Sequence, residues 1–361
     1  MTGTMTWAAM DVHARSTYAA SLDVMTGELT RRRFDTGAVE PVVAWLAGLP
    51  GPVRACYEAG PTGFGLYRAA GAAGIDCQVI APSKTPRASG DHNKSDRRDT
   101  DLLLRQLMAG ALTPVAVPAP TFEAARDLAR AREQIRADLM RCRHRVSKLL
   151  LRHGRVYDRK AWTQAHRQWL AAQSFEQVNT ELAFIDNLAA CDGLMTRKQA
   201  LDERLSWVAT DPEFWPVVRR LRAFRGIDTL SALILLLEVT DFARFPRAVQ
   251  LGSWLGLVPS REQSGESDVH GSITKTGSRY ARRILVEAAW HYARPPGLGR
   301  SLYERQEGLP DHVLQIASRA QHRFYRIHKR MRERRKKPGN VITVACAREL
   351  ACFLWAAATA P

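Results

Sequence analysis

Residues 6–34 read TWAAMDVHARSTYAASLDVMTGELTRRRF, and this stretch decides the fold of the N-terminal region. Its apolar runs at 6–10, 18–24 and 29–34 predict three strands, with a hairpin turn at 25–28 between the last two. Farther along, 39–49, 62–73 and 100–109 have helical apolar spacing, whereas 53–57 and 76–80 are short buried strands. A hairpin followed by mixed strands and helices predicts an α/β domain with a central mixed sheet over residues 1–113.

Four acidic side chains of this region stand where two predicted strands end and a helix begins. Asp11 ends the first strand and Glu58 ends a later one, while Asp96 and Asp99 lie three residues apart on one face of a helix. Burying an unpaired carboxylate is costly, so such groups are usually paired or metal-bound. The four acids form an oxygen-rich site for hard cations, and two Mg²⁺ held about 4 Å apart suit in-line phosphodiester chemistry. Without a cation, their repulsion is expected to raise the pKa of at least one of them.

This arrangement is the one found in RNase H-like nucleases, where the first acid lies on strand one of a hairpin-led sheet. Simpler interpretations stay open, because an Asp after a strand is often a turn residue and an Asp at a helix start can cap it. Asp101 is interpreted as a spare acid that faces solvent or pairs with Arg97 or Arg105. The histidines without a partner at metal-ligand spacing are interpreted as structural: His13, His92 and His291.

Charge separates the C-terminal region from the rest of the chain. The 361 residues carry 53 Lys and Arg against 36 Asp and Glu, a net charge of +17, and most of the excess lies in residues 216–361. This asymmetry indicates a polyanion-binding half, the alternative being a basic protein with scattered solvated arginines. A hydrophobic content of 45% excludes a disordered or fibrous protein. No apolar run reaches the ~18 residues of a membrane span, so we expect no membrane partner. The six cysteines lack CxxC spacing, so we expect reduced thiols in a cytoplasmic protein.

Long helices are predicted after the proline-rich linker at 113–120. Residues 122–151 and 175–208 carry apolar stripes that predict an antiparallel helical arm or coiled coil over 114–215, or an ordinary bundle. The region 216–361 is mostly helical, with candidate helices at 221–239, 248–255, 280–292, 312–335 and 341–358. Between them, 259–278 is predicted to be a polar loop of about 20 residues, long enough to suggest a function.

That polar stretch holds the second group of candidate residues. Ser264 precedes Gly265, where the backbone can approach a phosphate closely. A serine hydroxyl there can form a covalent intermediate with a DNA phosphate, although a loop of this composition is most often only a loop. Residues 221–233 look like a helix-hairpin-helix phosphate contact or, alternatively, a corner in the core. Basic residues that can pair with phosphate oxygens follow: Lys275, Arg279, Arg282, Arg283, Arg323, Arg326, Arg330 and Arg334.

Seven short motifs, taken in order, carry a family resemblance. They are MDVH (10–13), YEAGPTG (57–63), KSDRRD (94–99), LRAFRGI (221–227), LGSWLGLVP (251–259), SGES (264–267) and GSITKTG (271–277). The set resembles the Asp-Glu-Asp-Asp (DEDD) transposases of bacterial insertion sequences, also called bridge-RNA-guided serine recombinases. The resemblance implies a RuvC-like nuclease domain of RNase H fold over 1–113, a coiled-coil arm over 114–215 and a transposase domain with a catalytic serine over 216–361.

The resemblance also implies the site residues and the partners. Asp11, Glu58, Asp96 and Asp99 would bind Mg²⁺, with Mn²⁺ substituting, and Ser264 would attack DNA to give a phosphoserine link. The expected partners are double-stranded donor and target DNA, a structured guide RNA and further copies of the chain. The copies are expected to form a dimer that assembles to a tetramer, in which each active site combines domains of different protomers. The expected location is the bacterial cytoplasm, at the nucleoid.

Other functions remain open from the sequence. A site-specific DNA invertase of the same family would carry the same motifs. A metal-only Holliday-junction nuclease would use the acids and leave Ser264 as a loop residue, and a catalytically silent nucleic-acid-binding protein would use neither.

Overall fold

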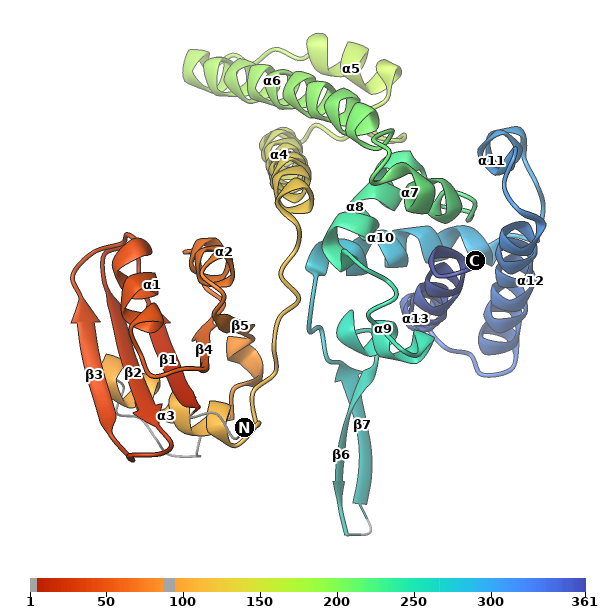
Figure 1. The fold of residues 1–361 in the computed structure, drawn as a ribbon. Coiled ribbons are helices and arrows are strands. Elements are labelled where there is room, and N and C mark those ends of the chain that lie inside the picture. Colours follow the sequence, from red (N-terminus) through yellow and green to blue (C-terminus); the bar gives the residue numbers. More distant parts are fainter. Residues whose placement is uncertain (1–4, 87–94, 266) are drawn as a thin grey trace. The chain divides into compact units, whose positions relative to one another are not determined.

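The computed structural model describes residues 5–86, 95–265 and 267–361, which form two compact units, Met1–Pro118 and Ala119–Pro361 (Figure 1). Each unit has its own hydrophobic core and is described by itself. The interpretation of His92 as a structural histidine falls outside the described residues.

A five-stranded mixed sheet with the spatial order β3-β2-β1-β4-β5 organises the first unit. Its strands are β1 (Thr6–Val12), β2 (Thr17–Asp23), β3 (Leu29–Phe34), β4 (Val53–Glu58) and β5 (Asp76–Ile80). The first three strands are antiparallel neighbours, whereas β4 pairs in parallel with both β1 and β5. The predicted α/β domain with a hairpin-led mixed sheet is confirmed.

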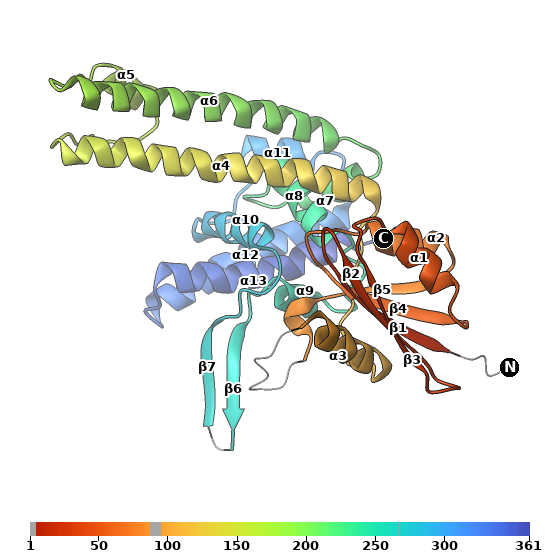
Figure 2. The same cartoon turned by 90° about the vertical axis from the view of Figure 1, so that its left-hand side faces the viewer.

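Helices cover both faces of this sheet (Figure 2). The helices α1 (Glu40–Ala47) and α2 (Gly65–Ala72) pack on one face, together with Met10 and Tyr57. The helix α3 (Asp96–Met108) packs on the other face, against Ala9 and Cys56. Successive residues of a strand point to opposite faces, so β1 and β4 are buried on both sides and their sequences are almost continuously apolar. A short 3₁₀ helix, η1 (Pro82–Lys84), follows β5.

Two long antiparallel helices begin the second unit, α4 (Pro120–Arg152) and α6 (Val178–Val208). Their direction follows from the contacts, because Arg132 of α4 pairs with Asp202 whereas Arg145, farther along α4, donates to Asn187, which comes earlier in α6. Both helices were predicted within three residues of their observed ends. The helix α5 (Gln164–Ala171) between them was not predicted. All six cysteines are free thiols.

The rest of the second unit is a helical core from which one β-hairpin extends (Figure 1). Its elements are α7 (Trp215–Leu221), α8 (Thr229–Val239), α9 (Ala248–Trp254), β6 (Pro259–Ser264), β7 (Ser267–Ile273), α10 (Arg279–Trp290), η2 (His291–Ala293), α11 (Arg300–Gln306), α12 (Asp311–Glu333) and α13 (Gly339–Ala358). The candidate helix at 221–239 is interrupted by a turn in which Gly226 has φ +81°, as in the alternative interpretations of 221–233 as a helix-hairpin-helix or a corner. The expectation of a polar loop over 259–278 is wrong, because most of this stretch forms the β6–β7 hairpin.

The helix α13 is more apolar than the sequence analysis allowed. It has 20 residues, and an 18-residue window within it has a mean hydropathy of 1.6, which by length and composition alone suffices to cross a membrane. The window is not an uninterrupted apolar run, because Arg348 and Glu349 lie within it. In the structure, however, Cys346, Leu350 and Leu354 of α13 are buried in the same core as α10 and α12. Burial within a helical core accounts for its composition.

Candidate functional site

Strand geometry brings Asp11 and Glu58 to one edge and one face of the sheet. Asp11 is two residues beyond Ala9 on β1, and Glu58 is two residues beyond Cys56 on β4. Because side chains alternate along a strand, both acids belong to the face that α3 covers. Because β1 and β4 are parallel and adjacent, both acids also lie at the same end of the sheet. The sheet thus places two carboxylates beside the start of α3.

The N-terminus of α3 supplies the other two acids. Ser95 is the N-cap of this helix, and its hydroxyl accepts a hydrogen bond from the backbone N–H of Arg98. Since Ser95 fills this role, Asp96 and Asp99 are not the capping residues, which removes one alternative interpretation of these acids. Asp99 lines a cavity of about 220 Å³ together with Asp11 and Glu58. The hydroxyl of Thr85, which also lines this cavity, donates a 3.0 Å hydrogen bond to Glu58 Oε1 and orients that carboxylate.

His13 is a member of this cluster that the sequence analysis missed. Its Nε2 lies 3.3 Å from Asp11 Oδ2 and 3.9 Å from Asp96 Oδ1. The sequence analysis interpreted His13 as a structural residue, whereas its side chain is about half exposed and faces two of the four acids. The only signal in the sequence was its position two residues after Asp11, which spacing rules for metal ligands do not single out. The backbone N–H of His13 donates to Ser16 O, so a tight turn after β1 brings the ring back to the site.

The electrostatics of Asp11 reflect this crowding. Partial burial raises the pKa of Asp11 above its ordinary value, His13 opposes this effect, and the nearby charges of Asp96, Asp99 and Glu58 add to the rise. The direction of the pKa shift at Asp11 agrees with the expectation for one of the four acids, but burial contributes more to it than the repulsion on which the expectation rested.

Asp101 lies outside the cluster. It accepts two hydrogen bonds from the guanidinium of Arg31 on β3, at 3.0 and 2.9 Å. The expectation that Asp101 faces solvent or pairs through its carboxylate with Arg97 or Arg105 is wrong. Arg105 instead donates to the backbone carbonyl of Asp101. The partner was not predictable from local spacing, since Arg31 is 70 residues away in the sequence.

The donor set fits a divalent cation. Ligand atoms of Asp11, His13 and Asp96 all lie within 4.8 Å of one another. Opposite ligands of an octahedral ion with bonds of about 2.1 Å are about 4.2 Å apart, so one ion spans such a set with modest movement. Carboxylate oxygens suit Mg²⁺ and Mn²⁺, and an imidazole nitrogen suits Mn²⁺ better than Mg²⁺. These residues are therefore able to hold a hard divalent cation.

Ser264, the other candidate catalytic residue, lies at the tip of the β6–β7 hairpin in the second unit. It forms the last pair of the ladder with Ser267, so the chain reverses within two residues, the first of which is Gly265 with φ +54°. Every residue of β6 is exposed. Among the described residues, no hydrogen bond to the Ser264 side chain is present. The nearest cation along β6 is Arg261, whose guanidinium donates two hydrogen bonds, of 2.7 and 2.8 Å, to the carboxylate of Asp268. Ser264 is thus exposed and, within the described part of the hairpin, its hydroxyl has no hydrogen-bond partner.

The root of this hairpin is packed far more tightly than its tip. A Cβ on Gly256 would lie 2.3 Å from the backbone N of Thr276, and one on Gly277 would lie 2.1 Å from Trp254 O, so both positions admit only glycine. The guanidinium of Arg282 donates to Leu255 O at 2.9 Å and to Thr276 O. Arg282 therefore joins the segments that enter and leave the hairpin.

The remaining basic candidates differ in what they contact. Lys275 is exposed beside the root of the hairpin and has φ +56°. Arg279 donates to the hydroxyl of Tyr280, whereas Arg283 is bound by Glu133 and Glu287. The candidates on or after α12 are all exposed: Arg323, Arg326, Arg330 and Arg334. Of these, Arg323 pairs with Glu349, while the other three have no ion pair among the described residues.

A mixed sheet of this topology with carboxylates at the ends of its first and fourth strands is consistent with the RuvC-like class of nucleases. Comparison with known proteins gives the family. Residues 8–154 match the DEDD model for IS110-type transposases, and residues 218–304 match the model described as the transposase IS116/IS110/IS902 family. The chain belongs to this family of insertion-sequence transposases.

Named relatives agree with this assignment. The chain is 31% identical to the transposase for insertion sequence element IS1533 of Leptospira borgpetersenii over 92% of this chain and 98% of the relative. It is 40% identical to the protein y4qE of Sinorhizobium fredii, named as a transposase, over 84% of this chain and 74% of that one. The protein is therefore an enzyme, a DNA transposase, and its family implies DNA binding and a divalent metal at the acidic site.

Proposed function

We propose that this transposase cleaves and rejoins DNA strands through a covalent phosphoserine at Ser264, assisted by Mg²⁺ at Asp11, Glu58, Asp96 and Asp99. The observation that carries the proposal is the place of Ser264, exposed at the tip of a hairpin whose root is rigidly held. In the cleavage step the serine oxygen forms a bond to phosphorus. The bond from phosphorus to a deoxyribose oxygen breaks, and that oxygen takes up a proton. In the rejoining step the hydroxyl of another strand displaces the serine oxygen, which regains a proton.

The acidic cluster supports the metal part of the proposal. A bound divalent cation supplies charge stabilisation to the phosphoryl oxygens as they become more negative. The residues of the chain hold that cation, with Asp11 and Glu58 fixed by the sheet and Thr85 orienting Glu58. We include His13 as a further ligand, because its Nε2 is as close to Asp11 as a second ligand of one ion would be.

The partners of the reaction belong to the same proposal. The chain acts on double-stranded donor and target DNA, guided by a structured RNA, as a dimer that assembles to a tetramer. In this proposal the chain has three functional segments: the nuclease domain over 1–113, the coiled-coil arm over 114–215 and the transposase domain with the catalytic serine over 216–361. Supporting this, the exposed arginines of α12 provide a surface for phosphates, and the long antiparallel pair α4–α6 provides extended helical faces for association. A site-specific invertase would use the same residues, and the ends of its DNA substrate would distinguish it.

The decisive experiment traps the reaction and identifies the linked peptide by mass spectrometry. We expect a nucleotide adduct on Ser264, which Ser264→Ala abolishes while metal and DNA binding persist. The matched control is Ser267→Ala, which changes the residue paired with Ser264 across the hairpin and should keep the adduct. An adduct on Ser267, Ser272 or another residue contradicts the assignment. Cleavage without any adduct favours the metal-only Holliday-junction nuclease.

The metal site is tested separately by Glu58→Ala and Asp99→Ala. Both variants should lose strand cleavage and keep DNA binding, because they remove ligands without removing positive charge. Asp101→Ala is the matched control, since this acid is on the same helix as Asp99 but pairs with Arg31 outside the cluster. Wild-type cleavage by either variant would show that the residue is not a ligand.

A further inference from the structure

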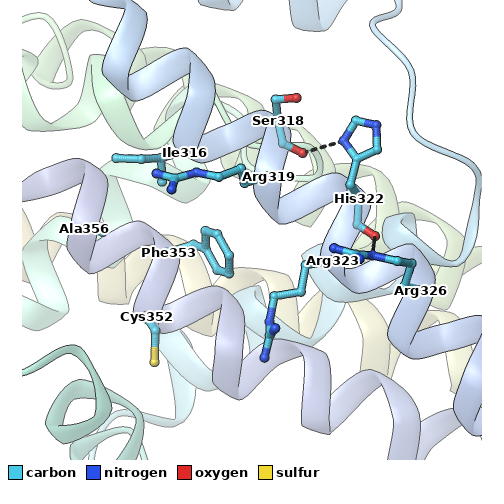
Figure 3. A pocket seen from close by; sticks show the side chains of 9 residues that line it. All are labelled: Ile316, Ser318, Arg319, His322, Arg323, Arg326, Cys352, Phe353 and Ala356. Carbon is cyan, nitrogen blue, oxygen red and sulfur yellow. Dashed lines mark hydrogen bonds between the residues drawn. The ribbon is translucent and has the colours of Figure 1, made fainter.

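A pocket between α12 and α13 shares no lining residue with the acidic cluster or the Ser264 hairpin. It has a volume of about 540 Å³, within the range of about 300–1,000 Å³ typical of small-molecule sites. One wall comes from α12 and the other from α13, and we call it the α12–α13 pocket (Figure 3). Its lining is Ile316, Ser318, Arg319, His322, Arg323, Arg326, Cys352, Phe353 and Ala356.

The α12 wall of this pocket is cationic. Arg319, Arg323 and Arg326 are spaced by four and three residues, so they lie on one face of the helix. None of the described residues that line the pocket is acidic. Arg323 pairs with Glu349, whereas Arg319 and Arg326 have no acidic partner among the described residues. The same row continues past the pocket through Arg330 and Arg334, which line an adjoining depression. A polyanion that follows α12 would therefore pass over the mouth of the pocket.

The α13 wall is apolar and contains an aromatic ring. Phe353 is half-buried, and the buried Phe324 contacts it edge-on, with 5.4 Å between ring centroids. Figure 3 shows the Phe353 ring amid the lining side chains, with Arg319 and Arg323 on opposite sides of it in this view. Ile316 and Ala356 complete the apolar surface. A row of arginines alone would suit a duplex backbone, but the apolar surface with a supported ring suits a planar apolar group joined to an anion.

An unpaired nucleotide has this composition, because it joins a flat base to a phosphate. Proteins that hold single strands combine a cationic groove with aromatic rings on which bases stack. A paired base in a duplex cannot enter such a pocket, since both of its faces are stacked inside the helix. Strand exchange by a DNA transposase separates DNA strands from their complements, so the established activity supplies unpaired DNA.

We propose that the α12–α13 pocket binds an unpaired nucleotide of single-stranded DNA. The base lies against Phe353, and the flanking phosphates pair with Arg319 and Arg326. The site holds a displaced strand and takes no part in the chemical step. It goes beyond the serine and metal chemistry proposed above and does not depend on either.

The test measures binding of the full chain to three fluorescent 12-mers of one sequence: single-stranded DNA, duplex DNA and a single strand whose bases are replaced by abasic sites. Phe353→Leu keeps an apolar side chain of similar size and removes the ring. We expect it to weaken binding of single-stranded DNA by about 5- to 150-fold, the usual loss for one stacked base. Binding of the duplex and of the abasic strand should change less than twofold, because their phosphate contacts remain.

A second variant protects the test against a folding defect. Ala356→Leu fills the pocket and keeps the Phe353 ring, and it should produce the same selective loss. Tyr303→Leu is the matched control, since Tyr303 is an exposed aromatic residue on α11 outside the pocket. The proposal is overturned if both pocket variants bind single-stranded DNA as the wild type does. It is equally overturned if they lose duplex binding to the same extent, or if an RNA 12-mer of that sequence binds more tightly than the DNA and alone responds to the variants.

Discussion

Replacing Glu133 by Gln tests how the second unit is held together around the root of the β6–β7 hairpin. The Glu133 side chain is 1% exposed and binds three guanidinium groups, those of Arg132 at 2.6 Å, Arg136 at 3.2 Å and Arg283 at 2.6 Å. Arg283 is on α10 and Glu133 is on α4, so this cluster joins the long helix pair to the helix that follows the hairpin. Glu133→Gln keeps the shape but removes the acidic partner of Arg136, and it leaves Arg132 and Arg283 with only Asp202 and Glu287 as counter-charges.

The expected loss is large for a single substitution. Removing one partner of a buried ion pair typically costs about 3–5 kcal/mol. For a unit of this size each kcal/mol shifts Tm by about 2–4 °C, so the expected decrease is about 6–20 °C. The matched control is Asp138→Asn on the same helix. Asp138 pairs with Arg141 at i,i+3, but both side chains are largely exposed, and we expect a loss below about 0.5 kcal/mol.

The pH dependence gives an independent check. Burial raises the pKa of Glu133, but the charges and hydrogen bonds of Arg283, Arg132 and Arg136 outweigh burial and hold the pKa below its ordinary value. A carboxyl with a lowered folded-state pKa stabilises the fold fully above its unfolded pKa of about 4.3 and loses that contribution as pH falls through the folded pKa. The difference in unfolding free energy between wild type and Glu133→Gln should be constant from about pH 8 to pH 5 and shrink below about pH 4. A difference under about 1 kcal/mol at pH 7, or one unchanged down to about pH 3, would refute this reasoning.

Three further outcomes are expected. Asp11→Asn should abolish cleavage and stabilise the metal-free protein at pH 7 by about 0.5–2 kcal/mol. The reason is that the pKa of Asp11 is raised in the folded protein, so its negative charge destabilises the fold above that pKa. An unchanged or lower Tm would contradict this expectation. His13→Gln should remove the nitrogen coupling from the electron spin-echo spectrum of bound Mn²⁺ while Mn²⁺ still binds, and persistence of that coupling would show that His13 is not a ligand. Neutralising the exposed Arg326 and Arg330 of α12 and Arg334 just after it should weaken DNA binding equally for all sequences. The slope of log K against log salt should fall by about one for each phosphate that is no longer neutralised, whereas an unchanged slope would mean that these arginines face solvent.

The N-terminal fold was predictable from the sequence because its strands are short, apolar and separated by clear turn residues. The acids at strand ends were predictable for the same reason, since a carboxylate at the end of a buried strand stands out against its neighbours. His13 and the partner of Asp101 were not predictable, because a tight turn and a contact across 70 residues decide them. The β6–β7 hairpin was missed because its exposed strands carry no alternation of apolar and polar residues. The split at Gly226 depends on packing, since a Cβ there would lie 2.8 Å from Ala288 Cα.

The β6–β7 hairpin is tightly packed at its root and exposed at its tip, so a small rotation at the root moves the tip by a larger distance. Ser264 is five residues beyond Pro259, so a strand rise of about 3.4 Å per residue carries its hydroxyl about 17 Å outward. Tilting the hairpin by about 5° at its base would then move the Ser264 hydroxyl, the proposed nucleophile, by about 1.5 Å, and misplacement by about 1 Å is enough to slow a reaction about 100-fold. The position of this hydroxyl is therefore set at the far end of the hairpin, by Gly256, by Gly277 and by the hydrogen bonds of Arg282 to Leu255 and Thr276.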